Sequence, residues 1–94
     1  MYHILYSEDT PENRKDFLNN WINSYCQMQT DINFGISAYT IAKNFSRLYF
    51  RITEHDLILE FIARGYKSGI KDNAVYFNIA PNCQALRNFR IGWN

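Results

Sequence analysis

The sequence predicts an α+β fold, with three helices followed by a short C-terminal β-hairpin and an additional strand at the N-terminus. Three segments repeat apolar residues at helical spacing, and each follows a Ser or Thr that can cap a helix. A further segment, residues 74–80, alternates apolar and polar residues as a half-buried strand does. The 94 residues suffice for one domain and are too few for two, so we expect residues 1–94 to fold as a single domain.

The first two predicted elements are a strand over residues 2–6 and a helix from Pro11 to about Gln29. The apolar run YHILY indicates the strand. Thr10 suits the N-cap of the helix, and Pro11 suits its first position, where a missing N–H costs no hydrogen bond. The core face of this helix is marked by aromatic residues that recur every four positions: Phe17, Trp21 and Tyr25.

A second helix is predicted over residues 38–48, with Ser37 as its cap. Ile36 precedes the cap and can pack on Ile41 as a hydrophobic staple, which sets the angle at which the chain enters the helix. Residues 32–36 alternate apolar and turn-forming residues, and this pattern predicts one very short strand before the helix.

A third helix is predicted to begin after Thr53. Asp56 stands three residues beyond this cap, where its carboxylate can accept from the N–H of the cap and complete a capping box. Gly65 or Gly69 is expected to end the helix, with Lys67 in its last turn. The helical period places four apolar residues on its buried face: Leu57, Ile58, Phe61 and Ile62.

The C-terminal third of the chain is predicted to hold a hairpin and a segment of undecided structure. Asp72 and Asn73 separate two short runs and are typical of a tight hairpin turn. The tail fits either a short helix over residues 83–88 or a further strand that ends at Trp93.

Three segments follow one another along the chain. GISAYTIAKNF is predicted as a short strand and the second helix, ITEHDLILEFIARGYKSG as the third helix and the residues that leave it, and IKDNAVYFNI as the hairpin. In this order the chain resembles the winged helix-turn-helix domains over about residues 11–80, by pattern and not by an invariant motif. The resemblance implies double-stranded DNA as the partner, with the third helix in the major groove and the wing against the backbone. Many winged helices bind proteins instead, so a protein partner stays open.

The cations are concentrated in the second half of the chain. The net charge is only +1, but residues 1–42 carry two basic and five acidic residues, whereas residues 43–94 carry eight basic and four acidic ones. An excess of basic residues in one half of a chain is typical of a polyanion-binding face, and equally of an ordinary solvated surface. Seven of these cations are the predicted phosphate contacts if DNA binds: Lys43, Arg47, Arg51, Lys67, Lys71, Arg87 and Arg90.

The acidic opening of the third helix argues against its reading DNA. Glu54, Asp56 and Glu60 are predicted on its outer side, where carboxylates would repel phosphates, and Glu60 can pair with Arg64 four residues later. The same three acids could instead meet a basic protein partner. The resemblance to winged helices and the basic second half of the chain still favour a small nucleic-acid-binding regulator, encoded by a phage or mobile element, and this is what we expect. The alternative is a protein-interaction module, such as an inhibitor or adaptor of a host protein, and a homodimer is left open.

No catalytic, metal or cofactor site is predicted. His3, His55, Cys26 and Cys83 match no zinc-ligand spacing, and the chain has no glycine-rich phosphate loop. We therefore expect neither an enzyme nor a bound cofactor. With no signal peptide and no apolar run of membrane length, we expect a cytoplasmic protein whose two cysteines are reduced and buried, although the sequence leaves a disulfide open.

Overall fold

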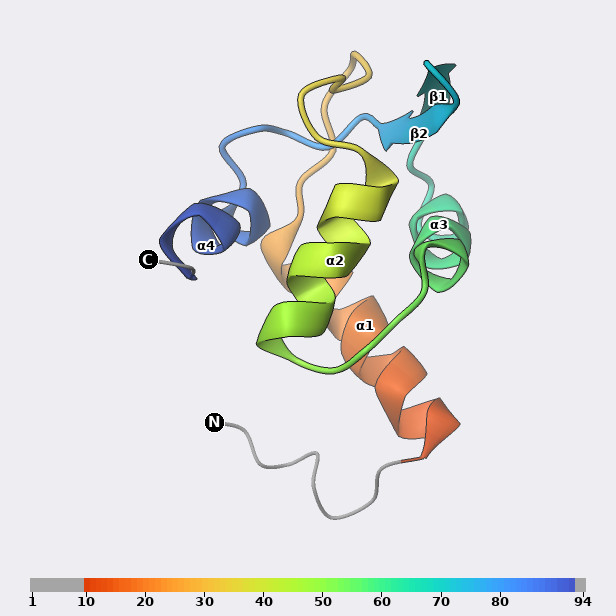
Figure 1. Ribbon diagram of the computed structural model, residues 1–94, viewed down its shortest axis with the longest axis vertical. Coiled ribbons are helices and arrows are strands. Elements are labelled where there is room, and N and C mark those ends of the chain that lie inside the picture. The colour runs from red at the N-terminus through yellow and green to blue at the C-terminus, as the bar shows by residue number, and fades with distance from the viewer. Residues whose placement is uncertain (1–9, 93–94) are drawn as a thin grey trace.

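The computed structural model describes residues 10–92, in which four helices accompany a two-stranded antiparallel sheet. The α+β class is confirmed, and the predicted count of three helices is wrong because the tail also forms one. The strand predicted at residues 2–6 lies outside the described residues. Figure 1 shows α2 between α1, α3 and α4, with the hairpin beyond its N-terminal end. The elements in chain order are α1 (Pro11–Tyr25), α2 (Ala38–Leu48), α3 (Glu54–Ala63), β1 (Ser68–Lys71), β2 (Ala74–Phe77) and α4 (Gln84–Gly92).

Helix α1 begins as predicted and ends earlier than predicted. The Thr10 side chain caps it, and Pro11 occupies its first turn. It ends at Tyr25 because Cys26 turns to an extended conformation, with φ −101° and ψ 145°. The chain beyond it then runs beside the segment that follows β2, with Met28 opposite Ile79 in an isolated antiparallel bridge. This pairing supplies backbone hydrogen bonds that a longer helix would have made internally.

The predicted starts of α2 and α3 are confirmed. The Ser37 hydroxyl accepts from the N–H of Thr40 at the start of α2. At the start of α3 the Thr53 hydroxyl accepts from the N–H of Asp56 (3.0 Å), and the Asp56 carboxylate accepts from the N–H of Thr53 (3.3 Å). These reciprocal bonds satisfy N–H groups that have no partner within the helix.

The end of α3 decides between the two predicted glycines. The helix ends at Ala63, and Gly65 has a φ of +91°, the left-handed conformation that glycine adopts at low cost. The prediction that Lys67 lies in the last turn is wrong, because the chain has already left the helix. Lys67 instead leads into β1.

The predicted hairpin turn is confirmed. Asp72 and Asn73 have φ values of 53° and 65°, so both adopt the left-handed conformation that a two-residue turn of this kind requires. The strand predicted over residues 74–80 is too long, because the ladder that pairs Ser68 with Phe77 ends there. The short strand predicted over residues 32–36 is reduced to a single bridge between Ser37 and Tyr76.

Aromatic side chains join the helices and the sheet in one core. Phe45 of α2 is fully buried and packs edge-to-face on Trp21 of α1, with ring centroids 4.9 Å apart. Trp21 also stacks on Phe89 of α4, and Phe61 of α3 stacks on Phe77 of β2 at 5.0 Å. The tail forms a helix because α4 contributes Phe89 and its neighbours to this core, which supplies the tertiary packing that short helices need.

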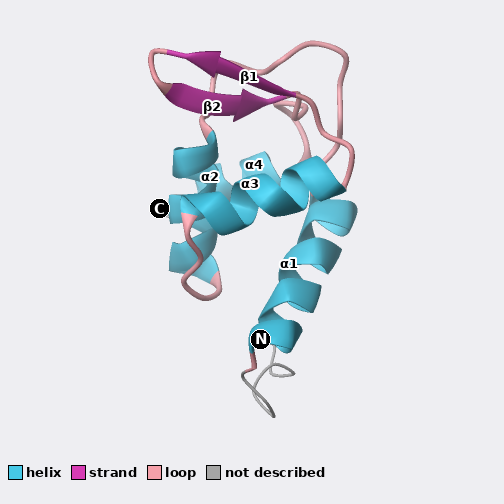
Figure 2. Ribbon diagram, turned by 90° about the vertical axis from the view of Figure 1, so that its right-hand side faces the viewer, coloured by secondary structure: helices cyan, strands magenta, loops and turns pink. Residues whose placement is uncertain are grey.

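The buried amide of Asn78 connects three segments of the chain. Its Oδ1 accepts from the N–H of Lys67 and its Nδ2 donates to the carbonyl of Gln29, each at 2.7 Å. Its backbone N–H and carbonyl bond to the same two residues, at 3.1 and 2.9 Å. Asn33 adds a second amide contact by donating from Nδ2 to the carbonyl of Ile79. In Figure 2 the loop between α1 and α2 accordingly runs up to the hairpin.

We expect Asn78→Ala to lower the free energy of unfolding by about 2 kcal/mol, because it leaves an N–H and a carbonyl without partners. Urea denaturation followed by circular dichroism measures this. The control is Asn82→Ala, an exposed loop asparagine whose replacement should cost less than about 0.5 kcal/mol. Equal losses in the two variants would contradict the role assigned to Asn78.

Candidate nucleic-acid interface

Helix α2 directs two basic side chains away from the core. Its inner face is buried at Ile41 and Phe45, and Lys43 and Arg47, four residues apart, are exposed on the outside. The turn that follows is closed by Ser46, whose hydroxyl accepts from the N–H of Ile52 at 3.0 Å and can donate to its carbonyl. This closure leaves the intervening arginine of the turn, Arg51, exposed beyond the C-terminal end of α2.

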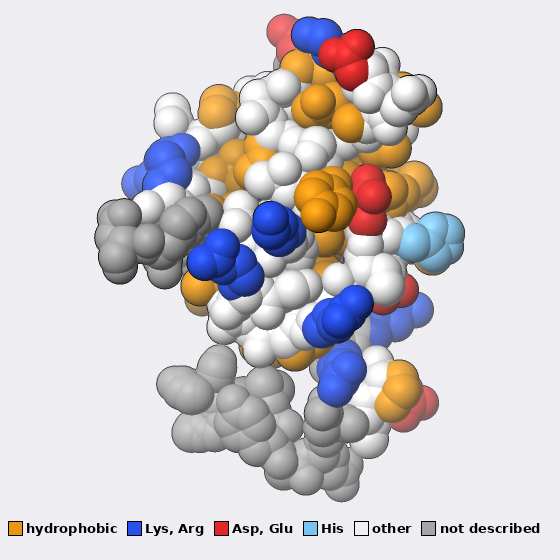
Figure 3. Space-filling view, in the orientation of Figure 1, with side chains coloured by type: hydrophobic (Ala, Val, Ile, Leu, Met, Phe, Trp, Pro, Cys, Tyr) orange, Lys and Arg blue, Asp and Glu red, His pale blue; other side chains and the backbone are white. Residues whose placement is uncertain are grey.

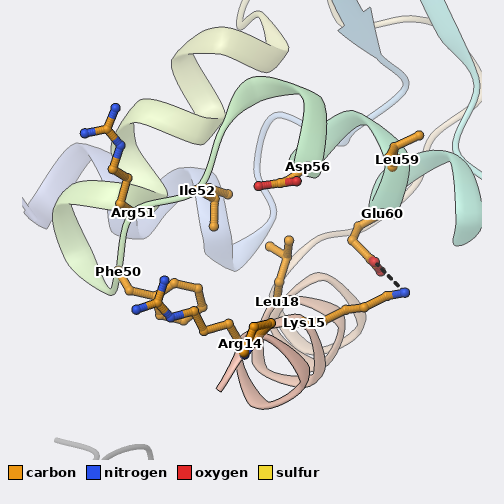
Figure 4. Close-up of a pocket in the computed structure, with 10 residues that line it drawn as sticks. Arg14, Lys15, Leu18, Phe50, Arg51, Ile52, Asp56, Leu59 and Glu60 are labelled. Atoms are coloured by element: carbon orange, nitrogen blue, oxygen red, sulfur yellow. Dashed lines mark ion pairs between the residues drawn. The ribbon is translucent and has the colours of Figure 1, made fainter. Parts of the chain in front are cut away.

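A groove of about 580 Å³ lies between α1, the α2–α3 turn and α3 (Figure 4). Arg14 and Arg51 line it, and the Arg14 guanidinium lies 5.6 Å from the centroid of the Phe50 ring, a cation–π contact. At the α3 side of the groove, the Lys15 ammonium lies 3.9 Å from the Glu60 carboxylate. The groove therefore has arginines at one end, the Lys15–Glu60 ion pair at the other, and the Asp56 carboxylate along its α3 side.

A smaller groove of about 300 Å³ separates α2 from α4, and Arg90 lines it together with Asn44 of α2. Arg90 therefore lies at the side of α4 that borders α2. In Figure 3 basic side chains extend over α2 and α4 and past the lower end of α2, while the acidic side chains of this view lie at its top and along its right side. We call five residues the basic band: Arg14, Lys43, Arg47, Arg51 and Arg90.

Four of the seven predicted phosphate contacts belong to the basic band, Arg87 lies three residues before Arg90 on α4, and the two remaining lysines lie at the hairpin. Arg87 is exposed on α4 and donates to the Gln84 side chain at 2.7 Å. Lys67 precedes β1, and the Lys71 ammonium lies 5.4 Å from the centroid of the Phe34 ring. The hairpin pairs with Ser37, at the opposite end of α2 from Arg51, so its cations do not extend the band.

Arg14 is the member of the band that sequence reasoning missed. It belongs to the acidic half of the chain, so a charge count by halves hides it. Arg14 lies one helical turn after the Thr10 cap, on the exposed side of α1. It comes next to Phe50 only when α1 packs against the α2–α3 turn. No sequence signal links these two residues.

The predicted acidic outer stripe of α3 does not exist. Glu60 is only 8% exposed and faces α1, where it pairs with Lys15. The predicted pair of Glu60 with Arg64 is also absent from the described contacts, since the Arg64 guanidinium bonds to the side chain of Asn19 on α1. Glu54 is half-buried and Asp56, which completes the capping box, is the exposed one of the three acids, so they present no continuous surface.

The outward face of α3 is instead apolar. Leu59 and Ile62 are 52% and 51% exposed, so the prediction that Ile62 belongs to the core is wrong. This short helix carries apolar residues on both of its faces. Glu60 pairs with Lys15 of α1 and Arg64 bonds to Asn19 of α1, so these polar contacts turn one face of α3 toward α1 and leave Leu59 and Ile62 exposed. An apolar helix face is unsuited to DNA base edges and phosphates.

Comparison of the chain with known protein families, curated proteins and solved structures finds no match. Between residues 10 and 92, no helix is long and apolar enough to cross a membrane. Nor does that part of the chain gather three or more His, Cys, Asp or Glu side chains in a geometry that could hold a metal ion. The two cysteines are buried and not bonded to each other.

We expect Leu57→Ala to lower the free energy of unfolding by about 2–5 kcal/mol, because Leu57 is fully buried. Ile62→Ala, which removes a side chain of the same size from the same helix, should cost less than about 1 kcal/mol. Thermal and urea denaturation of the two variants measure this difference. A cost at Ile62 as large as that at Leu57 would mean that Ile62 is in the core.

Proposed function

We propose that this chain is a small nucleic-acid-binding protein on a winged-helix scaffold, which holds double-stranded DNA by its phosphate backbone through the basic band. The observation that carries the proposal is the run of basic side chains that extends over α2 and α4 and past the lower end of α2 in one view of the surface (Figure 3). Two further cations share the groove beside the α2–α3 turn, which Arg14 and Arg51 both line. A domain of net charge +1 attracts a polyanion only where its charges are sorted in this way.

Two features support the winged-helix scaffold. The helix order and the hairpin follow the family's pattern, and the Ser37–Tyr76 bridge brings the segment before α2 alongside β2. β2 thus has β1 on one edge and this segment on the other. The fourth helix is an addition to that pattern, and it contributes Arg90 to the band.

The expected binding mode departs from the one that the family implies. The exposed side of α3 presents Leu59 and Ile62, so we do not expect α3 to read bases in the major groove. Arginine and lysine contacts to phosphates set position and affinity and carry no sequence information directly. The chain should therefore bind duplex DNA with little sequence preference.

We expect the affinity for random-sequence duplex DNA to fall by a factor on the order of 10²–10³ between about 50 and 200 mM salt, as four or five phosphate contacts imply. Fluorescence anisotropy with a labelled duplex at several salt concentrations gives the slope. An absence of binding at the lower salt concentration would remove the proposal.

Charge reversal locates the contact. Arg47→Glu should weaken DNA binding by about tenfold or more at low salt, because it removes a cation from the middle of the band and adds a repelling carboxylate. Lys71→Glu makes the same charge change on the hairpin and should alter the affinity by less than about threefold. Unchanged urea midpoints would show that both variants fold. A larger loss of affinity in Lys71→Glu than in Arg47→Glu would show that the hairpin makes the contact.

A second candidate function, protein binding through α3, is favoured by the exposure of Leu59 and Ile62. Leu59 and Ile62 lie three residues apart on one face of α3 and are each about half exposed, and contiguous exposed apolar surface marks protein-binding sites when it is extensive. If it operates, a Leu59→Lys, Ile62→Lys double variant should lose a bound partner that the Arg47→Glu variant keeps. Quantitative co-purification of the two variants compares them, and a partner set unchanged in the double variant would count against this surface.

A further inference from the structure

Two buried cysteines lie at the ends of two helices that are far apart in the sequence. Cys26 is the first residue after α1, and Cys83 immediately precedes α4, where its carbonyl accepts the N–H of Arg87. The two residues are only 7% and 2% exposed. Neither the basic band nor the apolar face of α3 uses them.

Backbone pairing brings these two cysteines together. The N–H of Ala80 donates to the carbonyl of Gln27 at 2.7 Å, and the N–H of Cys83 donates to the carbonyl of Ala80 at 3.2 Å. Residues next to Cys26 and residues just before Cys83 are thus bonded to one another. As a result the two cysteines lie in the same buried part of the core while remaining unlinked.

We propose that Cys26 and Cys83 form a redox-active dithiol, which hydrogen peroxide or a similar small peroxide converts to an intramolecular disulfide. In the first step the Cys83 thiolate attacks one peroxide oxygen, the O–O bond breaks, and the products are a Cys83 sulfenic acid and hydroxide. In the second step the Cys26 sulfur attacks the Cys83 sulfur and water leaves. Overall, two thiols and one hydrogen peroxide give one disulfide and two waters, so the thiols are oxidised and the peroxide is reduced.

The surroundings divide the roles of the two thiols. A hydrogen bond from Cys26, together with backbone N–H groups at the start of α4, outweighs burial and holds the pKa of Cys83 below its ordinary value. The same hydrogen bond and burial raise the pKa of Cys26. Since the thiolate is the reactive form, Cys83 is the attacking residue and Cys26 the resolving one.

Tyr66, in the connection between α3 and β1, is buried in the same core as the two cysteines. Burial, and then the two neighbouring cysteines, raise the pKa of its hydroxyl above the ordinary value, so it stays neutral. Because both cysteines are buried, a small neutral peroxide is the oxidant that suits them. The resulting bond would tie the end of α1 to the start of α4.

The test treats the folded wild-type chain with a small excess of hydrogen peroxide, then unfolds it and alkylates the remaining thiols for mass spectrometry. We expect the loss of both free thiols, a mass decrease of two hydrogens in a monomer, a Cys26–Cys83 cross-linked peptide, and full reversal by dithiothreitol. The Cys26→Ser variant should stop at a Cys83 sulfenic acid that dimedone traps. The Cys83→Ser variant should keep its Cys26 thiol.

Several outcomes would overturn the proposal. Two alkylatable thiols in the treated wild-type chain would show inert, merely buried cysteines. Sulfinic acid on Cys83 with Cys26 still free, or a disulfide between two chains, would show that Cys26 does not resolve the intermediate. Oxidation no faster than global unfolding, measured by hydrogen exchange, would assign the reaction to the unfolded chain. Because these results come from the wild-type chain, misfolding of a serine variant does not affect them.

Discussion

The buried amide of Asn78 is the interaction on which the arrangement of the other elements depends. Each end of its side chain is bonded to the backbone of a different segment, Lys67 after α3 and Gln29 after α1. A buried amide that uses both its donor and its acceptor specifies one geometry, because any other leaves polar groups without partners. The connection thereby sets where α1 ends, where α3 leads into the hairpin, and how both lie relative to β2.

The positions of α2 and its charges follow from this frame. With α1 and α3 set by their connections to β2, α2 lies between them, and aromatic packing around Phe45 determines which of its faces is buried. The opposite face carries Lys43 and Arg47 outward. The α2–α3 turn, closed by Ser46, presents Arg51 next, and packing of Phe89 on Trp21 brings Arg90 of α4 close to α2. The basic band is thus a product of core packing and not of a charged sequence motif.

Features governed by neighbouring residues could be predicted from the sequence, and features governed by distant partners could not. The Thr53–Asp56 capping box and the Asp72–Asn73 turn depend on local geometry, and both form as expected. The end of α1 and the burial of Glu60 depend on segments that pack only in the folded chain. Helical periodicity predicts one buried face of α3 that includes Ile62, whereas the structure leaves Ile62 51% exposed. Four members of the basic band could be predicted as phosphate contacts from the sequence. The fifth, Arg14, could be linked to them only in the folded chain, where it packs on Phe50.

A two-dimensional NMR titration of the backbone amides with random-sequence duplex DNA at about 50 mM salt tests the proposed function most directly. It reports on every amide of the folded chain at once and needs no substitution. We expect the largest shifts at Lys43, Arg47 and Arg51 and at their neighbours in α2 and the α2–α3 turn, with the amides of the β1–β2 turn nearly unmoved. Shifts centred on the exposed side of α3 or on the hairpin, or no shifts at all, would contradict binding through the basic band.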